Sequence, residues 1–356
     1  MINDKENRKL AYFFTSGSVG GAERVTLTIA KLLSKDKFDV HIVHICRNIR
    51  DLDKFVPENM SQSQIKISNI WDFTTWKIYR LLKKNKPDVV FCSLNYLNVR
   101  VIFAAKMAGI KKIIVRNNIG WIRWPRFMKT LAKLSYPKAS AIILQTKEMK
   151  MEFDKVMPSV SKLTCAIPNP LDIDTISTKL KAINNPFDNN EKVNFVYAGR
   201  IDRLKGLDVL LKAFNIVRER QPAAYLTIVG AYNITDEYYK DLVKIIKEFQ
   251  LENYVEFVGF SENPYKYMMN ANCFVLPSRS EGNPNVLHEA MYLCTPVVAT
   301  ESIPIISQIV TRDRGLTVGV DDWRKMAEAM ITASKMKVSK PYDYTGGNNL
   351  FLVLFQ

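Results

Sequence analysis

The stretch VNFVYAGRIDRLKGLDVLLKAF, residues 193–214, decides the fold of this chain. Its first half is a short apolar run of strand length that ends at a glycine. Its second half, from Gly206 onward, carries apolar residues at helical spacing. A buried strand, a glycine loop and an amphipathic helix predict one βα unit of a parallel sheet that helices cover on both faces.

The same rhythm occurs in both halves of the chain. The strand-like runs of the first half are KLAYFFTSG (9–17), FDVHIVHIC (38–46), PDVVFCSL (87–94), KKIIVRN (111–117) and ASAIILQT (139–146). After CAIPNPLD (165–172) the runs are VNFVYAG (193–199), AAYLTIVG (223–230), VEFVGF (255–260), NCFVLPS (272–278) and TPVVAT (295–300). We therefore predict an α/β protein with two Rossmann-like doubly wound domains facing a cleft, in which ligands bind at the carboxyl ends of the strands.

The expected domains are residues 1–166 and residues 167–336. Residues 337–356 form a tail outside the rhythm. The tail ends in LVLFQ, which resembles part of a viral 3C-protease cleavage site. A cloning origin and a natural origin of this tail both stay open.

Charge is unevenly distributed along the chain, whose net charge is +16. Between Asp88 and Glu148 there are eleven Lys or Arg and no acidic residue. Tryptophans and other apolar residues interleave with these cations, which favours a peripheral contact of residues 100–138 with an anionic membrane surface. A solvated face and a nucleic-acid site are the alternatives. No apolar run reaches the roughly 18 residues that span a bilayer.

The segment SRSEGNPNVLHEA, residues 278–290, places Glu281 and Glu289 on either side of an expected helix start at Pro284. Between the two carboxylates lie Gly282 and the free backbone amides of the helix start, which suit an anionic phosphate. A nucleotide sugar has the matching order of sugar hydroxyls, diphosphate and ribose hydroxyls. The structural alternative is that Glu281 caps backbone amides and Glu289 is simply exposed.

Two cations follow the strand-like run 193–199. Arg200 and Lys205 stand on a loop at the carboxyl end of that strand, just before the next helix. Two such charges can neutralise a diphosphate and stabilise the negative charge that grows on it as it leaves. A ligand shared with the 281–289 segment explains both features better than two unrelated surface charges do.

The segments AGRIDRLKGLDVLLKAF (198–214) and VLPSRSEGNPNVLHEAMYLCTPVVAT (275–300) resemble the retaining GT-B glycosyltransferases of family 4, with their E-x7-E motif. The segments GSVGGAERV (17–25) and IPNPLD (167–172) resemble the same family, so the resemblance covers the chain to about residue 335. It implies that Glu281, Arg200 and Lys205 are catalytic. The residues that it implies for donor binding are Glu289, Gly282, Asn283, Asn285, Gly20 and Gly21.

The chain departs from the family where many members carry a histidine after the fourth strand of the first domain. Arg116, Asn117 and Asn118 stand there instead, and we place them on the acceptor side. These side chains can orient hydroxyls or phosphate, but they make poor general bases.

The resemblance implies a retaining hexosyl- or N-acetylhexosaminyltransferase that uses a nucleotide sugar, with UDP as the expected nucleotide. Together with the basic segment it implies a cytoplasmic enzyme, peripheral at the inner membrane face, with a glycan or polyprenyl-diphosphate-linked acceptor, as in polysaccharide, lipopolysaccharide or O-antigen synthesis. We expect no cofactor, metal or nucleic acid. A nucleotide-sugar epimerase of the same fold and a non-catalytic basic protein that binds nucleic acid are the alternatives.

Overall fold

The structure, a computed structural model, describes residues 8–17, 20–47, 56–67, 73–121, 124–181, 184–187 and 191–356 of the chain. It divides into two compact units. The first unit comprises Met1–Pro170 and Thr345–Gln356, and the second comprises Leu171–Tyr344. The division falls inside the IPNPLD segment, four residues later than the boundary that the sequence predicts.

The first unit is built on one parallel sheet with strand order β3-β2-β1-β4-β5-β6-β7. Its strands are β1 (Lys9–Thr15), β2 (Phe38–Cys46), β3 (Ser61–Lys66), β4 (Val89–Cys92), β5 (Lys112–Asn117), β6 (Ala141–Leu144) and β7 (Thr164–Ala166). Its α-helices are α1 (Gly21–Ser34), α2 (Thr74–Asn85), α3 (Asn95–Met107), α4 (Arg126–Ser135), α5 (Lys147–Val156) and α13 (Thr345–Phe355), and short 3₁₀ turns cover Tyr136–Lys138 and Pro158–Leu163.

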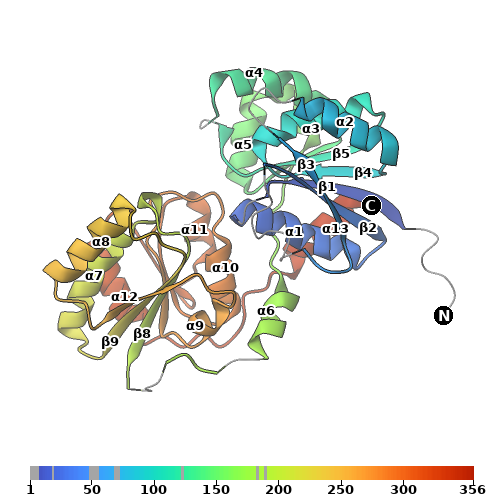
Figure 1. Cartoon of the computed structure of the whole chain (residues 1–356). Helices are drawn as coiled ribbons and strands as arrows, with labels where there is room; N and C mark the ends of the chain where they lie inside the picture. Colours follow the sequence, from blue (N-terminus) through green and yellow to red (C-terminus); the bar gives the residue numbers. More distant parts are fainter. Residues whose placement is uncertain are drawn as a thin grey trace. The chain divides into compact units, whose positions relative to one another are not determined.

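Helices cover both faces of this sheet, as Figure 1 shows. One face packs against α2, α3, α4 and α5 through buried side chains such as Ile78, Ile102 and Phe153. The other face packs against α1 and α13. Strands that are buried on both sides read as continuous apolar runs, which is the pattern that the sequence displays.

The second unit repeats this design with strand order β10-β9-β8-β11-β12-β13, again parallel. Its strands are β8 (Val193–Ala198), β9 (Ala224–Val229), β10 (Val255–Gly259), β11 (Cys273–Leu276), β12 (Val297–Thr300) and β13 (Gly315–Val318). Its helices are α6 (Ile173–Leu180), the 3₁₀ turn Arg203–Lys205, α7 (Leu207–Arg220), α8 (Glu237–Glu248), α9 (Tyr265–Met269), α10 (Asn285–Tyr292), α11 (Pro304–Ile309) and α12 (Trp323–Ala333).

Two apolar layers sandwich the second sheet as well. Helices α7, α8 and α12 pack on one face, and α6, α9, α10 and α11 pack on the other. The two α/β units confirm the predicted fold class.

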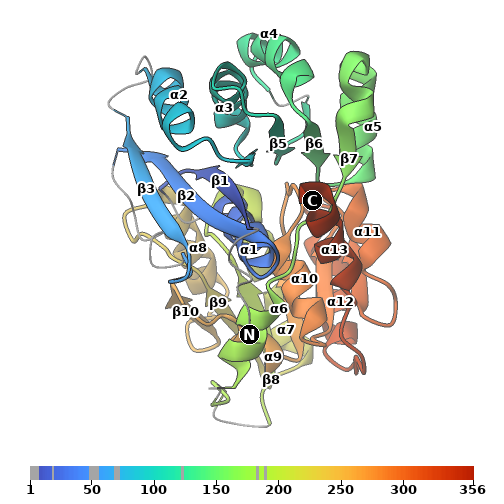
Figure 2. The ribbon, with the colours of Figure 1, turned by 90° about the vertical axis from the view of Figure 1, so that its right-hand side faces the viewer.

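The last helix of the tail, α13, does not belong to the second unit. Helix α13 returns to the first unit, where it lies beside α1 (Figures 1 and 2). Phe351 and Phe355 are fully buried there, and the ring of Phe355 lies 5.8 Å from that of Phe13 and 5.6 Å from that of Phe91. Each such phenylalanine contributes about 1.5–3 kcal/mol by burial. The part of the tail from Thr345 to Gln356 therefore belongs to the first unit, whereas residues 337–344 belong to the second.

Candidate active site

The loop before α7 and the loop after β11 are in backbone contact. Gly206, the N-cap of α7, has a φ of +66°. A Cβ atom at Gly206 would lie only 2.1 Å from the carbonyl oxygen of Pro277. In addition, the amide of Arg279 donates to the carbonyl oxygen of Leu204 at 2.8 Å. The carboxyl ends of the neighbouring strands β8 and β11 therefore present their loops as one surface.

Lys205 and Glu281 meet on this surface. Lys205 Nζ donates to Glu281 Oε1 at 2.7 Å, and Ser278 Oγ donates to the same oxygen at 2.6 Å. The two charged side chains are 17% and 9% exposed, so this ion pair is largely shielded from solvent. The structure thus brings these two predicted site residues into direct contact, and the ligand that they would share stays a prediction.

Arg200 lies at the exposed edge of the same surface. Its backbone carbonyl accepts from the buried Tyr197 hydroxyl at 2.6 Å, and its own side chain is 78% exposed, with Nη2 3.7 Å from Asp202 Oδ2. Burial raises the pKa of the Tyr197 phenol, and the nearby charges of Glu281 and Asp202 raise it further, whereas Arg200 lowers it. The charges of Arg200 and Glu281 therefore shift the pKa of the same hydroxyl group in opposite directions.

Helix α10 begins one residue later than the sequence predicts, with Pro284 as its N-cap. Asn283, which precedes this start, is buried, and its Oδ1 lies 2.7 Å from His288 Nε2. Burial lowers the pKa of His288 to about 3, so this histidine is neutral and fixes the segment before the helix. Gly282 and Asn285 flank this start and are half-buried.

Glu289 lies on the second turn of α10 and is half-buried. Four residues along a helix correspond to about 6 Å between Asn285 and Glu289 along the axis. The predicted arrangement of Glu281, helix-start amides and Glu289 around one ligand stays a prediction.

Arg279 and Asp208 were missed by the sequence analysis. Arg279 donates through Nη1 and Nη2 to both carboxylate oxygens of Asp208, at 2.9 and 2.6 Å, and through Nε to Asp321 at 2.7 Å. Burial alone would raise the pKa of Asp208, but the hydrogen bonds from Arg279 and Tyr238 outweigh burial and lower it. This two-pronged pair fixes the loop that carries Glu281 to the first turn of α7.

The acceptor-side residues lie at the carboxyl end of β5 in the first unit. Arg116 is fully buried and donates to the side-chain oxygens of Asn118 and Asn169. Asn117 Oδ1 accepts from the Tyr136 hydroxyl at 2.7 Å. The structure therefore brings Arg116 and Asn118 together, and it places Asn117 in a buried polar network.

Gly20 and Gly21 stand at the start of α1, also in the first unit. A Cβ atom at Gly20 would lie 2.5 Å from Glu23 Oε2, whereas one at Gly21 would meet nothing within 4 Å. Glu23 Oε1 accepts from Ser16 Oγ at 2.6 Å. Gly20 therefore lies directly against the buried carboxylate of Glu23. The contact of Gly20 and Gly21 with the donor stays a prediction.

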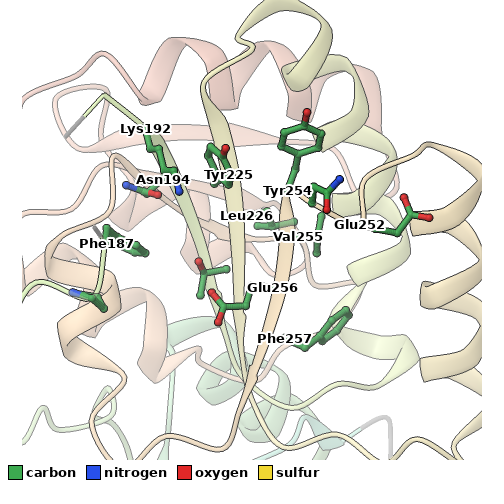
Figure 3. Close-up of a pocket in the computed structure, with 13 residues that line it drawn as sticks. Phe187, Lys192, Asn194, Tyr225, Leu226, Glu252, Tyr254, Val255, Glu256 and Phe257 are labelled. Carbon is green, nitrogen blue, oxygen red and sulfur yellow. The ribbon is translucent and has the colours of Figure 1, made fainter. Parts of the chain in front are cut away.

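A pocket of about 480 Å³ lies elsewhere on the second sheet (Figure 3). Residues from the amino-terminal halves of three adjacent strands line it, among them Asn194, Tyr225 and Glu256. The candidate catalytic residues follow the carboxyl ends of β8 and β11 and do not line it. This pocket is therefore separate from the surface around Glu281.

The sequence matches two family models. The model described as "Glycosyltransferase Family 4" matches residues 19–175, and the one described as "Glycosyl transferases group 1" matches residues 179–346. A Campylobacter jejuni relative, named N-acetylgalactosamine-N,N'-diacetylbacillosaminyl-diphospho-undecaprenol 4-alpha-N-acetylgalactosaminyltransferase, is 30% identical over 91% of this chain and 90% of its own. The chain belongs to the family 4 glycosyltransferases. It is thus an enzyme that transfers a sugar, as the sequence predicted.

Other relatives of this glycosyltransferase agree. An uncharacterized glycosyltransferase of Methanocaldococcus jannaschii is 32% identical over 65% of this chain, and the match spans 61% of that protein. The solved structure of Anabaena Alr3699/HepE in complex with UDP-glucose has a TM-score of 0.77 and 18% identity, and the match covers 98% of this chain and 99% of that one. The latter likeness confirms the GT-B fold.

Two findings bear on the predicted membrane contact of this glycosyltransferase. Among the described residues, none of the helices has the length and apolar character needed to cross a bilayer. The basic segment 100–138 includes Ile122 and Arg123, which lie outside the described residues. The rest of that segment forms part of α3, β5 and α4.

Proposed function

We propose that this enzyme is a retaining glycosyltransferase. It moves a sugar from a UDP-sugar to a lipid-linked or saccharide acceptor at the inner membrane face, in the assembly of a surface polysaccharide such as capsule or O-antigen. The observation that carries this proposal is the shielded Lys205–Glu281 pair, which lies where the loop before α7 meets the loop before α10. The pair joins a cation for the leaving group to a carboxylate for the sugar.

Lys205 has a role in leaving-group departure. An ammonium group has three N–H donors, so Lys205 can keep its bond to Glu281 and also donate to a donor diphosphate. Arg200, with its exposed guanidinium, supplies a second cation at the same loop. Both charges stabilise the negative charge that accumulates on the diphosphate as the bond to the sugar breaks.

Glu281 has a role in holding the sugar. Its Oε1 is engaged by Lys205 and Ser278, which fixes the plane of the carboxylate. The other oxygen is then oriented to accept hydrogen bonds from sugar hydroxyls. Glu289, one helical turn into α10, serves the ribose hydroxyls, and the amides of Gly282, Asn283 and Asn285 face the phosphate and sugar between the two acids.

Retention without a strong nucleophile in this proposed set of residues implies a front-face mechanism. The acceptor hydroxyl attacks the anomeric carbon from the face on which the diphosphate leaves. The carbon–oxygen bond to the diphosphate breaks, the new glycosidic bond forms, and a diphosphate oxygen takes the hydroxyl proton. No side chain then needs to act as the base, which is consistent with the neutral, buried His288.

The acceptor class is supported by relatives. Two Campylobacter jejuni relatives are named for transfer to sugars linked to diphospho-undecaprenol or PP-undecaprenol. A Staphylococcus aureus relative is named as a capsular polysaccharide biosynthesis glycosyltransferase. These names favour a polyprenyl-diphosphate-linked acceptor for this chain.

The reaction is tested with a panel of nucleotide sugars and a diphosphate-linked oligosaccharide acceptor. We expect one nucleoside diphosphate released for each sugar transferred, and a product whose anomeric proton coupling in NMR matches that of the donor. An inverted anomer would contradict the front-face mechanism. Conversion of the donor to its epimer without acceptor would favour the epimerase alternative.

Helix α4 supports the membrane part of the proposal. Phe127, Leu131 and Leu134 are 65%, 38% and 57% exposed, and their spacing of four and three residues places them on one face of the helix. Arg126 and Lys133 are exposed on the same helix. An apolar stripe flanked by cations is the pattern of a helix that lies in the interface of an anionic membrane.

We expect the double substitution Phe127→Ser and Leu134→Ser to weaken binding to vesicles that contain anionic lipid. Removing two apolar side chains from the membrane interface lowers affinity by roughly ten- to hundredfold. Vesicle co-sedimentation of the wild type and the variant measures this change. Met269→Ser in the second unit, which removes a side chain of 51% exposure, is the matched control and should bind like the wild type. Equal binding of the double variant would exclude α4 as the contact.

A further inference from the structure

Arg116 is a buried cation that forms no ion pair with any of the residues that the structure describes. Its side chain is fully inaccessible to solvent, and its Nη atoms donate to two neutral amide oxygens, on Asn118 and Asn169. Its Nε has no hydrogen-bond partner among the described residues. Burial lowers the pKa of Arg116 to about 9, so the guanidinium is still charged at neutral pH. A charge in this position normally has an acid beside it.

The residues around Arg116 form a connected polar network. Asn98 Nδ2 donates to the Arg116 carbonyl oxygen at 3.0 Å and to Asn117 Oδ1 at 3.2 Å. Asn95 Oδ1 accepts from the Asn118 amide at 2.9 Å, and Gln145 Nε2 donates to Asn118 Oδ1 at 3.2 Å. The Arg116 cluster, as we name it, consists of Asn95, Asn98, Arg116, Asn117, Asn118 and Gln145.

This cluster contains buried polar atoms without partners. Among the described residues these are the N–H donors Asn95 Nδ2, Arg116 Nε and Asn117 Nδ2, together with the oxygens of Asn98 (Oδ1) and Gln145 (Oε1). Buried polar atoms in native proteins nearly always have a partner, so a concentration of exceptions indicates a missing ligand or water. Charge and an excess of donors favour a ligand that is rich in negatively charged oxygen.

We propose that the Arg116 cluster is a subsite for a sugar that carries an oxyanion, either a phosphate or a carboxylate. Resting on the proposed function, this subsite belongs to the acceptor. The oxyanion binds Arg116 and the donor amides, and sugar hydroxyls donate to the oxygens of Asn98 and Gln145. Its position at the carboxyl end of β5, between the ends of β4 and β6, is where parallel sheets bind their ligands.

Arg116 has N–H donors with which it can bind an anion. A guanidinium binds an oxyanion most strongly through a pair of parallel N–H groups, and here Nε is unpartnered beside an Nη that is held by a neutral amide. Asn118 and Asn169 stand on the segments that follow β5 and β7. An arriving anion replaces one amide oxygen on Arg116, which exchanges a neutral hydrogen bond for a charge-assisted one.

The ligand has two sources with the same chemistry. A sugar joined to a lipid diphosphate presents a phosphate next to its ring, and a uronic acid presents a carboxylate on its ring. Glucose 1-phosphate and glucuronate represent these sources, and glucose is the neutral control. The binding measurements use the Lys205→Gln variant of the full chain, because the donor site would otherwise also bind phosphate.

Isothermal titration of this variant is expected to detect glucose 1-phosphate, glucuronate or both, and to detect no binding of glucose. Adding Arg116→Gln should weaken the binding at least tenfold, since a charge-assisted pair is lost. Lys111→Gln, which removes an exposed cation just before the amino end of the same strand, is the matched control and should leave the affinity unchanged. Binding of the phosphate alone or the carboxylate alone identifies the source.

Two further outcomes overturn the proposal. One is the absence of binding for both charged ligands, and the other is equal affinity with and without Arg116→Gln. Should Arg116→Gln fail to fold, the Nε–H resonance of Arg116 in the protein without that change gives the answer, because ligand binding must shift it. Sugar transfer is measured separately: transfer without anion binding contradicts only this subsite, and anion binding without transfer contradicts only the proposed function.

Discussion

Glu281→Gln is expected to lower kcat for sugar transfer by about 10²–10³-fold, the range found when one preorganised electrostatic contact to a transition state is removed. Glutamine keeps the size of the side chain and can still accept from Ser278. It loses the charge that pairs with Lys205 at 2.7 Å and that stabilises positive charge developing on the sugar. The melting temperature should change by only a few degrees, since one largely shielded ion pair is lost.

The measurement compares kcat and KM of Glu281→Gln with those of Glu219→Gln. Glu219 is an exposed residue on α7 in the same unit, so its substitution removes an equal charge away from the proposed site. The control should match the wild type in both constants. A Glu281→Gln enzyme with kcat within threefold of the wild type would remove Glu281 from the catalytic set and leave the family assignment intact.

The fold was predictable because its signals are local. The predicted strand runs, such as 193–199 or 272–278, are mostly apolar, and the helices between them show their own period. Three strands escaped prediction for reasons that are visible in their sequences. The β13 strand, GLTV, has only four residues and lies at the edge of its sheet. The β3 strand, SQSQIK, is a mostly polar edge strand with one buried side chain. The β7 strand has only three residues.

The candidate site was predictable to the extent that it lies on short motifs. A ligand shared by the loop of Lys205 and the segment of Glu281 was inferred because both follow strands of one sheet, but the direct ion pair of these two residues, 76 positions apart, was not predicted. Asp208 and Arg279 carry no motif, and only the three-dimensional contact reveals their bond. A charged pair of this kind has no sequence signal beyond its two residue types.

The same limit explains α13 and the Arg116 cluster. The sequence of α13 follows the last predicted βα unit and was therefore treated as a separate tail. Nothing in this sequence indicates which sheet the helix covers. The sequence places Arg116 on the acceptor side, but it indicates neither the burial of this cation nor its neutral neighbours. Sequence thus gives residue type and order, whereas burial and partner identity require coordinates.

Gly206→Ala is expected to destabilise the second unit by about 3–5 kcal/mol, a large effect for one methyl group. Two costs add at this position. A φ of +66° places a side chain in the left-handed region, at about 1–2 kcal/mol, and the new Cβ would lie 2.1 Å from the Pro277 carbonyl oxygen. Relief of that overlap must separate the loop before α7 from the loop after β11, and therefore Lys205 from Glu281.

Gly109→Ala separates the two costs, because Gly109 has a φ of +82° but no atom within 4 Å of its would-be Cβ. We expect this control to lose only the backbone contribution, so that thermal or urea unfolding ranks wild type above Gly109→Ala and Gly109→Ala well above Gly206→Ala. The Gly206 variant should also lose transfer activity, since the proposed catalytic pair of Lys205 and Glu281 is displaced. A cost at Gly206 no greater than at Gly109 would mean that the two loops separate easily. The contact between the loop before α7 and the loop after β11 would then be too weak to hold Lys205 against Glu281 without a bound donor.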